Sequence, residues 1–125
     1  MKTTITALAI LILLTGCSKK EGIIFCEGVD NNGKGVSCGK KFTTGEVTAL
    51  IDYKNSFEAD NLSIKIVSTS GSSETVINTI RIEVEREKST ASFNLPLYNE
   101  GAYRIEALKD DAKIAEGNIE VVDTY

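Results

Sequence analysis

Apolar and polar side chains alternate along most of the chain from Glu46 onward. A period of two places successive side chains on opposite faces, as in a β-strand with one buried face. Turn-forming Gly, Ser, Asn and Asp residues separate the alternating stretches. The pattern predicts six strands with these inward-facing residues: Val47, Ala49, Ile51 and Tyr53; Leu62, Ile64 and Ile66; Val76, Asn78, Ile80, Ile82 and Val84; Ala91, Phe93, Leu95 and Leu97; Tyr103, Ile105 and Ala107; Ile114, Ile119 and Val121.

A seventh strand is expected from either residues 23–25 or residues 36–42. From Glu46 onward, no stretch has the 3.6-residue period of an amphipathic helix. Short alternating strands separated by turns are typical of an antiparallel sandwich. The sequence therefore predicts an all-β, antiparallel β-sandwich of about seven strands, formed by one domain that covers residues 23–125.

The motif at residues 97–105 makes this prediction more specific. It reads Leu-Tyr-Asn-Glu-Gly-Ala-Tyr-Arg-Ile, with Gly101 two positions before Tyr103. The motif resembles the corner between strands E and F of immunoglobulin-like and fibronectin-type-III-like domains. The resemblance implies a tyrosine corner, in which the Tyr103 hydroxyl bonds to upstream backbone, and strands F and G at 102–108 and 113–122. The alternative is an ordinary turn followed by a strand; unlike antibody domains, the chain has no Trp.

The N-terminus has a different pattern. Lys2 precedes a short apolar run, Ile5–Leu14, which is too short for a spanning helix of roughly 20 apolar residues. A basic start, a short apolar run and small residues indicate a secretory signal peptide. Residues 1–16 are therefore left out of the predicted fold.

The run ends in Leu-Thr-Gly-Cys at Leu14–Cys17. This motif resembles the lipobox of bacterial lipoproteins. The resemblance implies removal of residues 1–16, lipidation of Cys17 with palmitate-like chains, and a lipid-anchored tether at residues 17–22. Ser18 after the cysteine favours the outer over the inner membrane, by analogy with enterobacterial sorting.

Cys26 and Cys38 remain once Cys17 is assigned to the lipid. An exported chain folds in an oxidising compartment, where such a pair forms a disulfide. The Asn- and Gly-rich segment between them is typical of a turn, so we expect a disulfide-clasped arm at residues 23–42. The alternatives are a redox pair or a metal site, which the spacing disfavours because it is not C-x-x-C.

The composition of the chain excludes several kinds of catalytic and metal-binding site. The chain contains no His, and its only methionine is Met1, which removes Ser-His-Asp catalysis and imidazole zinc sites. The net charge of −4 argues against a nucleic-acid partner. We expect no enzyme activity, no metal site and no cofactor.

A carboxylate-based hydrolase is the weakest functional hypothesis. Glu83, Glu85 and Glu87 lie on one face of a predicted strand, but basic neighbours favour a solvated face with ion pairs. The leading hypothesis is an envelope lipoprotein that binds a protein partner or has a structural role. The alternative is a surface-exposed module for adhesion or for binding a glycan or other ligand. Phe25, Tyr98 and Tyr125 are candidate aromatic contacts, although we expect Phe25 to pack in the domain instead.

Overall fold

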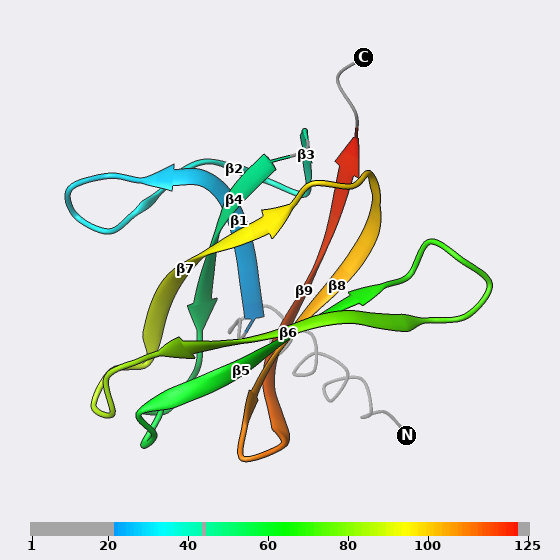
Figure 1. Ribbon diagram of the computed structural model, residues 1–125. Helices are drawn as coiled ribbons and strands as arrows, with labels where there is room; N and C mark the ends of the chain where they lie inside the picture. The colour runs from blue at the N-terminus through cyan, green and yellow to red at the C-terminus, as the bar shows by residue number, and fades with distance from the viewer. Residues whose placement is uncertain (1–21, 44, 123–125) are drawn as a thin grey trace, which may run out of the picture.

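The computed structural model describes residues 22–43 and 45–122, and their regular structure is entirely β. Within these ranges no helix is long and apolar enough to cross a membrane. Two sheets pack face to face (Figure 1), which confirms the predicted all-β antiparallel sandwich. The strands are β1 (Gly22–Val29), β2 (Gly35–Gly39), β3 (Lys41–Thr43), β4 (Gly45–Asp52), β5 (Asn61–Ser68), β6 (Thr75–Glu83), β7 (Thr90–Leu97), β8 (Gly101–Lys109) and β9 (Ala112–Val122).

The strand order is β2-β1-β4-β7 in the four-stranded sheet and β3-β9-β8-β5-β6 in the five-stranded sheet. Neighbouring strands are antiparallel, except for β3, which runs parallel to β9. The predicted strands F and G correspond to β8 and β9. In both sheets, some neighbouring strands are far apart in the sequence, such as β4 and β7 or β5 and β8.

The described residues form nine strands rather than about seven, because residues 23–42 supply β1, β2 and most of β3. We expected this arm to add only one strand to the sandwich. Instead β1 pairs with β4 throughout its first half, and Ile23 and Phe25 are buried in the core. Every residue of β2 is exposed, so alternation could not reveal that strand.

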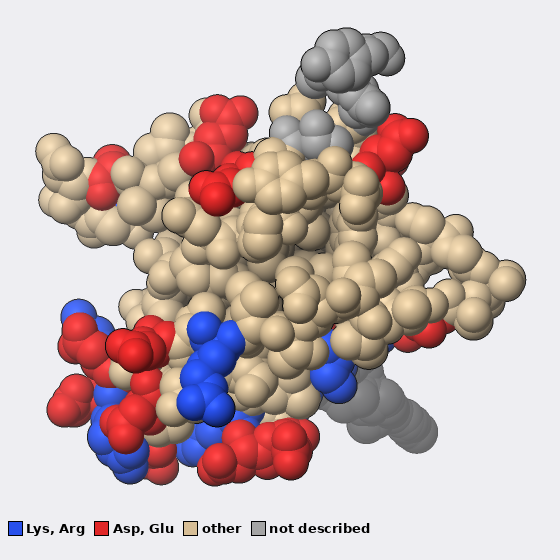
Figure 2. Space-filling view, in the orientation of Figure 1, with Lys and Arg blue, Asp and Glu red and all other residues tan. Residues whose placement is uncertain are grey.

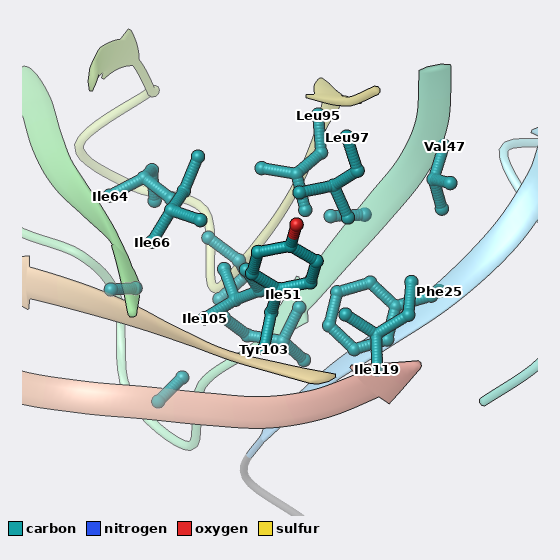
Figure 3. Packing of buried hydrophobic residues seen from close by; sticks show 14 of the residues in the cluster. Phe25, Val47, Ile51, Ile64, Ile66, Leu95, Leu97, Tyr103, Ile105 and Ile119 are labelled. Atoms are coloured by element: carbon teal, nitrogen blue, oxygen red, sulfur yellow. The ribbon is translucent and has the colours of Figure 1, made fainter. Parts of the chain in front are cut away.

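The core consists of inward-facing side chains from both sheets (Figure 3), among them Tyr103 and Ile105 of β8, and Leu95 and Leu97 of β7. The inward positions predicted for β4, β5 and β8 are buried, apart from Tyr53, which is partly exposed. Phe57 is an additional core residue: it is fully buried between β4 and β5, with its ring stacked 6.2 Å from that of Tyr53. It lies outside the alternating stretches, so the pattern gave no signal for it.

The two sheets approach each other closely where β9 passes β1. A Cβ atom on Gly117 of β9 would lie 2.3 Å from the carbonyl oxygen of Ile23 and 3.1 Å from Cε2 of Phe25. Glycine is therefore required at this point for the backbones to come together. This contact closes one side of the sandwich.

The opposite side of the five-stranded sheet, at β6, is less covered. Ile80, Ile82 and Val84 pack against the core but are only partly buried. Val76, predicted to face inward, is 52% exposed, and Ile77 is 50% exposed. The β5–β6 register shifts at this point and leaves Ile77 without a partner on β5, so the alternation of side chains is interrupted and the prediction for Val76 was wrong. Asn78, also predicted to face inward, is exposed as well.

We expect Gly117→Ala to destabilise the domain by about 1–3 kcal/mol, because the added methyl overpacks the β1–β9 contact. Gly28→Ala is the matched control, since nothing lies within 4 Å of the position that its methyl would take in β1. Urea unfolding checks both variants. Equal stability of the two would show that β1 and β9 do not approach as described.

Candidate functional site

A disulfide joins the two strands of the β1–β2 hairpin. Cys26 and Cys38 lie directly opposite each other and are bonded, which confirms the predicted pairing. Cys26 is completely buried, whereas Cys38 is exposed. The bond therefore fixes an outer strand to a strand that contributes to the core.

The tip of this hairpin is an ordered turn. The Asp30 carboxylate accepts hydrogen bonds from the amides of Asn32 (2.8 Å) and Lys34 (2.9 Å), and Gly33 has the left-handed φ of 81°. Behind the turn, a Cβ on Gly35 would lie 2.4 Å and 2.6 Å from the two disulfide sulfurs. The backbone thus packs directly on the disulfide, a contact that the sequence did not signal.

Tyr103 makes the contact expected of a tyrosine corner. Its buried hydroxyl donates a hydrogen bond of 2.7 Å to the carbonyl of Asn99. Burial raises the pKa of the Tyr103 hydroxyl above its ordinary value. Gly101 has a φ of 149°, and the amide of Ala102 donates to the Ser70 hydroxyl at 2.7 Å. These bonds hold the β7–β8 corner against the β5–β6 hairpin.

Replacing Tyr103 with Phe should cost about 1 kcal/mol of unfolding free energy, because the ring still packs but the hydroxyl bond is lost. Tyr98→Phe is a matched control, since this neighbouring ring is 62% exposed. Chemical denaturation measures both. An unchanged midpoint for Tyr103→Phe would contradict a stabilising role for the hydroxyl.

A second polar cluster connects the β5–β6 hairpin to β8. The guanidinium of Arg104 donates two hydrogen bonds of 2.7 Å to Glu74 and one of 2.7 Å to Glu106. These bonds lower the pKa of the Glu74 carboxyl and raise the pKa of Arg104. Arg104 and Glu74 are 30 residues apart, so this cluster could not be predicted from the sequence pattern. The cluster positions the start of β6.

The candidate acidic triplet is not gathered into a cleft. Glu83, Glu85 and Glu87 are exposed at the end of β6 and in the turn that follows. The neighbouring Arg86 forms an exposed ion pair of 3.5 Å with Asp60. Figure 2 shows acidic and basic side chains intermixed at the lower left, where this turn lies. The arrangement is that of a solvated charged surface.

The candidate aromatic contacts do not form one surface. Phe25 packs in the core, because β1 turns this side chain inward, which confirms the expectation that it packs rather than contacts a ligand. Tyr98 is exposed. Tyr125 and the predicted lipidation site Cys17 lie outside the described residues.

None of the three glutamates Glu83, Glu85 and Glu87 lines either of two surface grooves in the described part of the chain. One groove of about 550 Å³ includes Cys38 and Phe42; the other, of about 710 Å³, includes Ile24 and Leu50 on the outside of the four-stranded sheet. Residues 22–43 and 45–122 contain no group of three or more Cys, Asp or Glu residues arranged to hold a metal. The first groove is also lined by Glu27, Lys41 and Glu46, and the second by Asp52, Lys88 and Glu116.

Most exposed large apolar side chains lie at three separate turns. Val29 and Val36 flank the β1–β2 turn, Val76 and Ile77 follow the β5–β6 turn, and Tyr98 lies in the β7–β8 turn. The β1–β2 and β5–β6 hairpins project to opposite sides of the sandwich in Figure 1, so these residues do not form one patch.

No family model and no curated protein matches the sequence. Among solved structures, the chain is similar to the PmoD soluble domain from Methylocystis sp. ATCC 49242 (Rockwell), at 15% identity and a TM-score of 0.47 over 80% of this chain and 89% of that one. It is also similar to a superoxide reductase (neelaredoxin) from Ignicoccus hospitalis, at 10% identity and a TM-score of 0.44 over 96% and 98% of the respective chains. Similarities this low say nothing about the activity of the present chain.

Proposed function

We propose that this protein is a lipid-anchored lipoprotein of the bacterial envelope that acts as a non-enzymatic protein-binding module. The observation that carries the proposal is the β1–β2 hairpin, a rigid segment that exposes two large apolar residues. Val29 and Val36 are 43% and 45% exposed and flank the turn of this hairpin. Surface apolar groups of this kind supply the buried centre of protein interfaces.

The anchor follows from the resemblance of Leu14–Cys17 to a lipobox. A lipid on Cys17 would lie five residues before Gly22, and five extended residues reach only about 17 Å. The start of β1 would then stay near the membrane. Ser18 favours the outer membrane as the location.

The hairpin supports a binding role because it is held in shape before a partner arrives. The Cys26–Cys38 disulfide and the Asp30 turn restrict the segment that presents Val29 and Val36. Rigid contact segments lose less conformational entropy on binding. A hydrolase would instead need paired carboxylates flanking a substrate, and Glu83, Glu85 and Glu87 are dispersed over a solvated surface.

A surface adhesion or glycan-binding module is the second candidate, favoured by Tyr98. Tyr98 is 62% exposed in the turn between β7 and β8, where its ring is available for stacking on a sugar. Protease treatment of intact cells separates the two proposals: digestion of the domain supports adhesion, whereas protection supports a partner within the envelope.

Changing Cys17 to Ala should release the protein from membranes and abolish labelling by a palmitate analogue, because the lipidated thiol is lost. Fractionation and metabolic labelling measure the two effects. Cys38→Ala is a matched control that alters a cysteine of the folded domain and should leave labelling intact. Persistent labelling of the Cys17→Ala protein would overturn lipidation at this residue.

A further inference from the structure

The outer edge of β6 differs from the other three sheet edges. β3 has only three residues, β2 has five and includes Ser37 at a φ of 56°, and β7 carries Pro96. Short strands, irregular backbone and proline are features that prevent pairing with another chain. β6 is nine residues long and has a regular ladder with β5 from Asn78 to Glu83, so its far edge is open to a further strand.

The backbone orientation of β6 can be derived from one hydrogen bond. The amide of Val84 donates to the carbonyl of Asp60 at 3.0 Å, on the side of β5. Backbone groups of successive strand residues point alternately to the two sides. The amides and carbonyls of Arg81 and Glu83 therefore point away from β5, toward the open edge.

The same segment is complementary to itself. Residues 80–84 read Ile-Arg-Ile-Glu-Val. When a second copy runs antiparallel with Ile82 opposite Ile82, Arg81 lies opposite Glu83 of the other copy, and Ile80 lies opposite its Val84. Arg81 and Glu83, whose backbone groups face the open edge, then lie opposite each other and can form backbone hydrogen bonds. Their opposite charges are also directly across from one another, which stabilises strand pairs.

We propose that β6 pairs with β6 of a second copy of this chain, about a two-fold axis at Ile82, to give one continuous sheet across the dimer. Within the described residues, Arg81 and Glu83 form no ion pair. Pairing gives each of them one partner, and the Arg81–Glu83 pair occurs twice in the dimer by symmetry. The self-complementary contact is the isologous type expected of a two-fold dimer.

Pairing also covers apolar surface that the monomer leaves open. Ile80, Ile82 and Val84 face the core yet remain partly exposed at this edge. In the proposed register, the same three residues of the second copy lie beside them on the inner face. The added strand extends the core at the side where the four-stranded sheet ends.

The interface is small, so the dimer is expected to be weak and concentration-dependent. An edge contact of about five residues falls below the roughly 1,200 Å² at which stable interfaces begin. The start of β6 is nevertheless held in place by Arg104 and Glu74, which lowers the cost of ordering. This inference concerns the folded domain and does not rest on lipid anchoring or on the proposed partner.

Disulfide trapping of the full chain in membranes tests the register. With Cys17 lipidated and Cys26–Cys38 bonded, Ile82→Cys introduces a thiol at the two-fold axis. We expect it to form a disulfide-linked dimer under mild oxidation at least about tenfold faster than Ile77→Cys, a 50% exposed control on the same strand but outside residues 80–84. Wild-type protein controls for any thiol left on Cys17. Equal rates for Ile82→Cys and Ile77→Cys would overturn the proposal.

A charge-exchange series keeps Ile82 unchanged and so avoids any defect in packing. Arg81→Glu or Glu83→Arg places like charges opposite each other in both symmetric pairs, and should raise the dimer dissociation constant about tenfold. The double variant Arg81→Glu/Glu83→Arg should restore it. Sedimentation of the purified full chain in detergent measures the constant, and circular dichroism checks the fold.

The charge-exchange result is decisive in either direction. Loss of dimer in each single variant with recovery in the double variant supports pairing at Arg81 and Glu83. A monomer at all concentrations, or a dimer insensitive to these charges, contradicts it. Failure here leaves membrane anchoring intact, because Cys17 labelling is measured separately.

Discussion

The close approach of β1 and β9 at Gly117 constrains the rest of the sandwich. Backbone atoms of Ile23 occupy the space that a side chain at this position would need. Because the sheets converge on this side and contain unequal numbers of strands, β6 is left at the open side with a partly covered inner face. The contact between Gly117 and Ile23 therefore places the partly exposed apolar surface of the domain at β6.

Three local devices preserve this arrangement. The Cys26–Cys38 disulfide attaches β2 to β1, the Tyr103 hydroxyl fixes the β7–β8 corner, and Arg104 holds the start of β6 through Glu74. The disulfide acts on the β1–β2 hairpin, which carries Val29 and Val36. The fold is thus constrained where we propose that it meets a partner, which limits the entropy lost on binding.

Sequence alone was sufficient for features governed by local pattern. Alternation located the buried residues of β4, β5 and β8, and the Gly-x-Tyr motif located Tyr103. The sequence pattern failed for residues whose burial depends on packing between distant parts of the chain. Phe57 is buried by loop packing, and Val76 is turned outward by a register shift at an edge. Neither effect leaves a periodic signal. The candidate sites divide in the same way. The disulfide could be predicted because we expected the chain to be exported, and two cysteines in an oxidising compartment pair. The Arg104–Glu74 pair depends on residues that only the fold brings together.

Hydrogen exchange at two protein concentrations tests the central claim, that the sandwich is closed at β1–β9 and open to self-pairing at β6. The amide of Ile82, which points toward β5, should be protected at both concentrations. The amides of Arg81 and Glu83 should exchange rapidly in dilute protein and become protected as concentration rises. Protection of Arg81 and Glu83 that does not change with concentration would contradict the account.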